Sequence, residues 1–182
     1  MEKTTFIYNS LLKILDTADT ILKKVELHVT EGKATEAEVM DWKLIDDMLP
    51  FVRQIQILTD NVKGALCRIT NTENPKFEDN EKTIAELFTR IEKTRTFTKT
   101  IDVNKIGKIN SHINEINNAN GADAVDAMTI KLPWMPEGMS WTGKQYTEGF
   151  ILQNCYFHLI TAYGIVRSKG VQIGKMDFIG NI

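Results

Sequence analysis

YTEGFILQNCYFHLITAYGIV, residues 146–166, is the most apolar stretch of the sequence. Thr142 and Gln145 lie just before it with the spacing of a capping box, which typically marks the first turn of a helix. Apolar residues then occur on nearly every side of the predicted helix, as in a helix that is surrounded by other helices. We therefore expect this stretch to be the central and most buried helix of an all-α protein.

Three other segments show helical spacing of their apolar residues. They run from about Phe6 to Val29, from Pro50 to Thr70 and from about Glu81 to Ile101. Gly32 supplies a stop after the first, and Pro50 suits the start of the second. Together with the apolar stretch these segments predict a four-helix bundle.

Local signals also place the starts of two helices. Thr35 and Glu38 form a capping box and predict a short helix between the first two long ones. Asp79 or Asn80 is expected to cap the third long helix, where an acidic residue is favourable to the helix dipole.

The remaining segments are less regular. Between residues 102 and 141 the helical pattern weakens to isoleucines spaced from Ile106 to Ile116, and 128–134 is typical of a short extended segment. The tail 171–182 is expected to be irregular and docked on the bundle. Its apolar residues for docking are Val171, Ile173 and Phe178.

Composition favours one ordinary globular domain over the whole of residues 1–182. The chain has 182 residues, of which 42% are hydrophobic and 25% charged, enough for one sizeable core. Its 22 Lys and Arg and 24 Asp and Glu give a net charge of -2. Without a positive field, we expect neither nucleic acid nor an anionic membrane as a partner.

The sequence shows no sign of secretion or membrane insertion. Cys67 and Cys155 are far apart and form no CxxC pair, which favours a reduced, cytoplasmic protein. The first ten residues lack the apolar core of a signal peptide. Gln153, Asn154 and His158 interrupt the longest apolar stretch, which is therefore expected to be buried in the protein and not in a membrane.

The polar residues on this apolar helix are the candidate site. Asn154 and His158 are four residues apart and so project from one face of the helix. A buried amide or imidazole without a partner costs about 1–3 kcal/mol, so each needs a hydrogen bond, a water or an ion. Gln54 on the second long helix is close enough to the interior to be a third member. Two interpretations remain open: a hydrogen-bonded core network, or a ligand site.

Other residues are weaker candidates for site chemistry. Tyr163, Asp60, Lys63 and Arg167 could line the mouth of a pocket, and each is more often an edge hydrogen bond or a surface charge. Cys155 lies beside Asn154, but a cysteine on a buried helix usually behaves as a small hydrophobic residue.

Two signatures resemble a known superfamily. The run ENPKFEDNE, residues 73–81, with Arg90 and Ile91 following, is similar to one signature of the DinB-like (YfiT-like putative metalloenzyme) superfamily, in its branch of uncharacterised function. FHLITAY at 157–163 and GVQIGKMDFIG at 170–180 resemble a second. The match covers most of residues 49–180.

The resemblance implies an antiparallel four-helix bundle that is often a homodimer. Better-characterised relatives bind a divalent metal through three histidines, one on the second helix and an HxxxH pair on the fourth, and some act with low-molecular-weight thiols. Those positions correspond to Gln54, Asn154 and His158 here. His158 is then the one metal ligand that is kept, so the implied metal site is incomplete.

Two functions follow as hypotheses. In the first, a pocket formed by Gln54, Asn154, His158 and Tyr163 binds a small molecule or, more weakly, a divalent metal, with His158 as the candidate catalytic base. In the second, the protein is a non-catalytic homodimeric interaction module whose polar core only specifies the packing.

Overall fold

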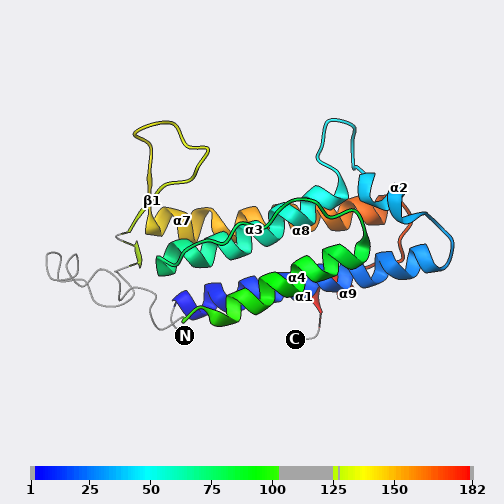
Figure 1. Cartoon of the computed structure of the whole chain (residues 1–182), viewed down its shortest axis with the longest axis horizontal. Coiled ribbons are helices and arrows are strands. Elements are labelled where there is room, and N and C mark those ends of the chain that lie inside the picture. The colour runs from blue at the N-terminus through cyan, green and yellow to red at the C-terminus, as the bar shows by residue number, and fades with distance from the viewer. Residues whose placement is uncertain (1–2, 103–124, 127, 181–182) are drawn as a thin grey trace, which may run out of the picture.

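A computed structural model of the chain describes residues 3–102, 125–126 and 128–180. Within these residues the protein is an all-α helical bundle (Figure 1). Two pairs of long helices form it: α3 lies beside α8, and α1 lies beside α4. The bounds of these helices are α1 Lys3–Thr30, α3 Phe51–Thr70, α4 Ile84–Thr100 and α8 Ile151–Ser168. The weak pattern expected from Ile106 to Ile116 lies outside the described residues.

The expected stops and starts of the first helices are confirmed. Gly32 follows α1 with a φ of 72°, in the left-handed region that glycine adopts without strain. Thr35 and Glu38 form the expected capping box of the short helix α2, Glu36–Asp41. Pro50 is the N-cap of α3.

The start of α4 differs from the prediction. Its N-cap is Thr83, which forms a capping box with Glu86, and neither Asp79 nor Asn80 caps the helix. Asp79 instead pairs with two arginines farther along the bundle, so its carboxylate is not at the helix start.

The apolar stretch around 146–166 is two helices and not one. α7, Gly143–Gly149, begins at the expected capping box of Thr142 and Gln145, and α8 follows after a break at Phe150. Phe150 leaves the helical conformation, with φ -127° and ψ -52°.

α8 is also not the most buried helix, contrary to the sequence prediction. It buries 7 of its 18 residues, whereas α3 buries 14 of 20. The reason is position: α3 contacts α8, α4, α1 and α2, while the outer face of α8 has no helix against it among the described residues. Phe157 and Ile160 on that face are 58% and 54% exposed.

A small hairpin precedes α7, where the sequence predicts an extended segment. β1, Thr129–Ile130, pairs antiparallel with β2, Trp141–Thr142, and the loop between them projects from the bundle (Figure 1). Gly143 follows the hairpin where any side chain would collide with the backbone, because an ideal Cβ would lie 1.6 Å from the carbonyl oxygen of Val125.

The tail packs on the bundle but is more regular than expected. Val171 and Ile173 are buried, and residues Lys175–Ile179 form the short helix α9 beside α1. The Gly174 N–H donates to the Asp177 carboxylate at 2.8 Å and closes the first turn of α9. That local hydrogen bond makes a helical turn where the glycines suggested irregular chain.

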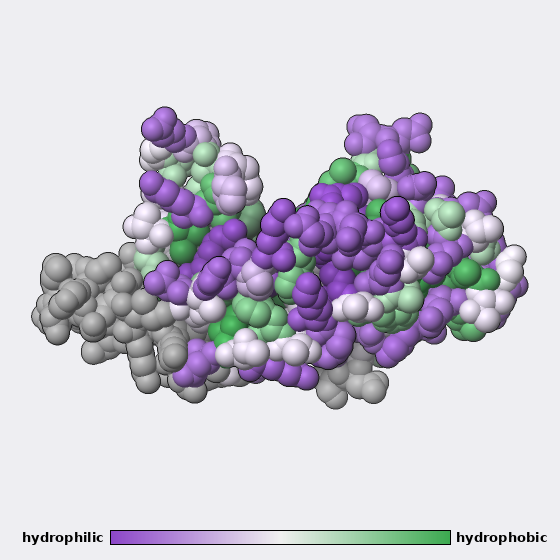
Figure 2. All heavy atoms as spheres, viewed as in Figure 1, coloured by the Kyte–Doolittle hydropathy of each residue, from purple (hydrophilic) through white to green (hydrophobic). Residues whose placement is uncertain are grey.

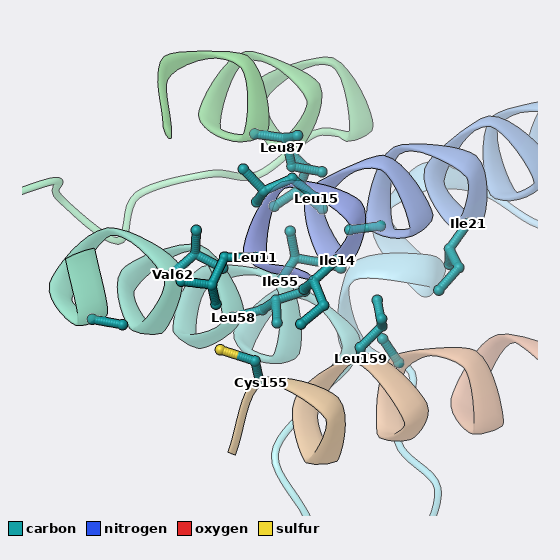
Figure 3. Packing of buried hydrophobic residues seen from close by; sticks show 14 of the residues in the cluster. Leu11, Ile14, Leu15, Ile21, Ile55, Leu58, Val62, Leu87, Cys155 and Leu159 are labelled. Atoms are coloured by element: carbon teal, nitrogen blue, oxygen red, sulfur yellow. The ribbon is translucent and has the colours of Figure 1, made fainter. Parts of the chain in front are cut away.

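The core lies between the four long helices (Figure 3). Cys155 is part of it: its side chain points from α8 toward α3, and the residue is 0% exposed. Burial raises the pKa of its thiol to about 12, so Cys155 is a packing residue and not a nucleophile at neutral pH. Side chains that meet here include Leu11, Ile14, Leu15, Ile55, Leu58, Val62, Leu87 and Leu159. Among the described residues, no helix is both long and apolar enough to cross a membrane.

Candidate functional site

Gln54 and His158 lie together between α3 and α8, as the sequence predicts. His158 Nδ1 is 2.9 Å from Gln54 Oε1, and Gln54 Nε2 donates to the carbonyl oxygen of Leu49 at 2.9 Å. Because the amide nitrogen is engaged by that carbonyl, the amide oxygen faces the ring and accepts. Nδ1 therefore carries the ring proton, and Nε2 keeps a lone pair.

The surroundings of His158 favour its neutral form. Burial lowers the pKa of the ring below the ordinary value of 6.5, because the charged form loses its hydration. His158 Nε2 has no hydrogen-bond partner among the described residues, and the nitrogen of a neutral imidazole can accept a hydrogen bond or a proton.

The residues at this position do not fit the three-histidine metal site of DinB-like relatives. Gln54 and Asn154 are neutral amides, and the oxygen of Gln54 is already bound to His158. Zinc and similar ions are held by imidazole, thiolate and carboxylate donors. No group of three such side chains that could hold a metal ion occurs in the described part of the chain.

Asn154 belongs to a separate pocket of about 470 Å³. We call it the α3 pocket: it is bounded by α3, the connector 71–83, the hairpin loop and the junction of α7 with α8. Figure 2 shows the surface hollowed between two projecting loops, one of them the hairpin loop, with mostly hydrophilic residues along the floor. The polar residues of the pocket are Asp60, Asn61, Lys63, Arg68, Asn74, Lys76, Asp79 and Asn154, and its aromatic residues are Phe77, Trp134, Tyr146 and Phe150.

Two contacts fix how α3 lies against the last helices. Gln54 near the start of α3 meets His158 on α8, and Arg68 near the end of α3 donates to the hydroxyl of Tyr146 on α7 at 3.3 Å. The helices are therefore antiparallel, and Asn154 falls between the two contacts. The α3 pocket opens at the Tyr146 end, away from His158.

Lys63 is a buried cation in the lining of this pocket. Its side chain is 4% exposed, and its Nζ donates to the carbonyl oxygen of Pro75 and lies 3.3 Å from Asp60 Oδ1. Nζ also lies 4.2 Å from the ring centre of Phe77, which Lys93 approaches from α4 at 4.0 Å. The Phe77 ring therefore lies between two lysines, and these contacts fix the connector against α3 and α4.

Arg90 anchors the other side of the connector and was not predicted from the sequence as part of any site. It is 2% exposed, and its guanidinium pairs with Asp60 at 3.1 Å, Asp79 at 2.9 Å and Glu81 at 2.9 Å. Its Nε also donates to Thr59 at 2.7 Å. The available signal was an arginine on the buried face of a helix, where an unpaired charge would be costly.

Two further candidates lie elsewhere. Tyr163 does not line the α3 pocket; its ring packs against Phe178 at 5.7 Å, because five residues along a helix turn it away from His158. Arg167 Nη1 donates to the carbonyl oxygen of Val171 at 3.5 Å and so holds the tail. Asp60 and Lys63 line the α3 pocket and not a pocket around His158.

The comparisons with known proteins agree with this fold. The profile of the family described as Domain of unknown function (DUF1993) matches residues 5–179. The crystal structure of a DinB family member protein from Shewanella denitrificans is similar, with a TM-score of 0.82 and 28% sequence identity over 98% of this chain and 94% of that chain. No curated protein matches the sequence. The chain therefore belongs to the DUF1993 family of domains of unknown function and has the DinB-like fold.

Proposed function

We propose that this DinB-like protein binds a small polar organic molecule in the α3 pocket, without a metal ion. One observation carries the proposal: a pocket of about 470 Å³ combines amide, cationic and aromatic side chains from separate elements. Pockets of this size with a few placed polar groups are typical of small-molecule sites. The side-chain Nδ2 of Asn61 is buried and has no hydrogen-bond partner among the described residues, so a ligand or water is needed beside it.

In this proposal His158 and Asn154 have different roles. Asn154 lines the pocket and contacts the ligand, whereas His158 is one turn farther along α8 and holds Gln54 through Nδ1. His158 does not line the pocket, so in this proposal it positions α8 against α3 and does not act on the ligand.

The test is a screen of neutral, anionic and cationic organic fragments by NMR, with amide shifts recorded on the whole chain. We expect at least one fragment to bind and to shift the residues that line the α3 pocket. Asn154→Leu should weaken that binding at least about five-fold, the loss of one hydrogen bond of about 1 kcal/mol. Gln153→Leu, an exposed neighbour on the same helix, is the matched control and should bind like the wild type.

Two outcomes would reject the proposal. In the first, no fragment shifts the pocket residues. In the second, Asn154→Leu binds as tightly as the wild type and as Gln153→Leu.

A second candidate is a homodimer, and the outer face of α8 favours it. Phe157 and Ile160 are exposed there, and Leu44 lies against Gly164 one turn farther on. Exposed side chains of this kind on a helix that is otherwise packed are typical of a protein interface. We propose a second copy of the chain as the occupant, because the exposed apolar side chains of Phe157 and Ile160 can pack against their own copies across a two-fold axis.

A further inference from the structure

The carboxylates of the α3 pocket are already paired with cations. Asp60 and Asp79 both bind Arg90, which lies outside the pocket lining, at 3.1 Å and 2.9 Å. Asp79 also binds Arg53 at 2.6 Å, and Asp60 lies 3.3 Å from Lys63. The carboxylates of the pocket are therefore each paired with cationic side chains, so they repel a bound anion less than free carboxylates would.

Arg68 is a pocket cation that has no carboxylate partner among the described residues. Its guanidinium donates to the Tyr146 hydroxyl, and burial raises the pKa of Tyr146, so this partner is neutral. The guanidinium lies over Gly64, where an ideal Cβ would be 2.6 Å from Arg68 Nη1 and 3.5 Å from Asn74 Nδ2. The glycine thus leaves room for two groups of N–H donors to lie beside each other.

The N–H donors in this part of the pocket all favour a ligand that offers oxygen acceptors. Arg68 and Asn74 supply N–H groups near Gly64, and Asn61 Nδ2 is a buried donor that lacks an acceptor among the described residues. A guanidinium presents paired N–H groups in one plane, which match the two oxygens of a carboxylate.

Aromatic rings form the other wall. Trp134 in the hairpin loop is 61% exposed, and its ring lies 6.0 Å from Phe150, which stacks on Tyr146 at 5.8 Å. Flat apolar groups pack well against such rings.

We propose that the ligand of the α3 pocket is an organic carboxylate with a flat apolar body, whose carboxylate binds Arg68 and whose body packs on Trp134 and Phe150. This proposal rests on the proposed function, that the pocket binds a small molecule, and it adds the chemical class of the molecule. A cavity of about 470 Å³ is large enough for such a compound.

The probes are phenylacetate, phenylacetamide and phenethylamine, which share one ring and differ in charge. We expect phenylacetate to bind at least about ten-fold more tightly than phenylacetamide, because a hydrogen bond to a charged group is about twice as strong as a neutral one. Phenethylamine should bind more weakly than either. The measurement is an NMR titration that follows the Trp134 indole and the amides of the pocket.

Variants assign the selectivity to Arg68. In Arg68→Gln the two compounds should bind with about equal affinity, whereas Arg68→Lys should keep part of the preference for phenylacetate. Arg95→Gln removes an arginine of α4 that lines none of the described pockets and should keep the full preference. If Arg68→Gln does not fold, the test uses the wild type and Arg68→Lys. A preference for phenylacetate that is smaller in Arg68→Lys than in the wild type supports the assignment, and an unchanged preference contradicts it.

The outcomes separate this proposal from the proposed function. Equal binding of the amide and the carboxylate, or a preference that survives in Arg68→Gln, would overturn the carboxylate assignment and leave a small-molecule pocket. If no fragment of any charge shifts the pocket residues, the proposed function fails as well. Loss of the preference in Arg95→Gln would show that it comes from the overall charge and would also overturn the assignment.

Discussion

At the scale of single residues, the buried pair of Gln54 and His158 explains how an imidazole remains in an apolar helix. The ring is satisfied at Nδ1 by an amide oxygen whose own nitrogen is bound to the carbonyl oxygen of Leu49. This chain of hydrogen bonds joins α3 to α8 and needs no ion. His158 is in consequence a neutral residue whose protonation would disturb the packing.

Acidification should therefore destabilise the protein partly through His158. Burial lowers its pKa in the folded chain below 6.5, the value expected when unfolded, so the unfolded chain takes up the proton first as the pH falls. The stabilising effect is present above pH 6.5 and is lost below it, by at most about 1.4 kcal/mol per pH unit for one proton. Urea unfolding at pH 7, 6 and 5 measures it.

The comparison is with His158→Gln, whose amide can still donate to Gln54. Its free energy of unfolding should fall less steeply between pH 7 and pH 5 than that of the wild type. Other titrating groups are shared by both proteins and cancel in the difference. Identical slopes would show that His158 does not carry the expected pH dependence.

The sequence predicted part of this site. The spacing of Asn154 and His158 on one helix and the resemblance of Gln54 to a ligand position led to the right contact between Gln54 and His158. It could not show that Asn154 faces a different pocket, because residues four apart on a helix differ by some tens of degrees in direction. That difference decides which side of α3 each side chain meets.

At the scale of elements, Arg90 explains the position of the connector 71–83. One buried guanidinium binds carboxylates of α3 and of the connector, and Phe77 is held between Lys63 and Lys93. The connector forms one wall of the α3 pocket, so the Arg90 network shapes a site that Arg90 does not line.

Arg90→Met should destabilise the protein by about 1–3 kcal/mol, because it leaves the Glu81 carboxylate, which is 10% exposed, and the buried Thr59 hydroxyl without their donor. The change in the free energy of unfolding is measured by urea titration. Arg95→Met is the matched control on the same helix: the carboxylates that Arg95 pairs with are 56% and 63% exposed, and such pairs contribute about 1 kcal/mol or less. Equal losses in the two variants would show that the network does not hold the connector.

Element boundaries were predictable where local hydrogen bonds set them. The capping boxes at Thr35 and Thr142 mark real helix starts, because they involve residues only three apart. The break at Phe150 was not predictable, since it coincides with packing against Trp134 and Trp141, and neither is close in sequence. The late start of α4 follows in the same way from the use of Asp79 by distant arginines.

At the scale of the whole molecule, hydropathy identified the bundle but not its central helix. α8 has the most apolar sequence, yet α3 has neighbours on more sides and buries more of its residues. The number of apolar residues in a helix does not say which of its faces another helix covers. The surplus on α8 is the exposed pair Phe157 and Ile160, and the homodimer proposal accounts for it.

If α8 forms a homodimer interface, a charge on its outer face should separate the subunits. Sedimentation equilibrium of the wild type should fit a dimer that dissociates on dilution, and Phe157→Glu should be monomeric at the concentrations where the wild type is dimeric. The reason is that each interface would then bury two like charges, one from each copy, without a partner. Ala85→Glu adds the same charge to an exposed position of α4, which is not part of the outer face of α8, and should leave the dimer intact. A wild type that stays monomeric up to about millimolar concentration, where an association free energy is only about -4 kcal/mol, would exclude this interface.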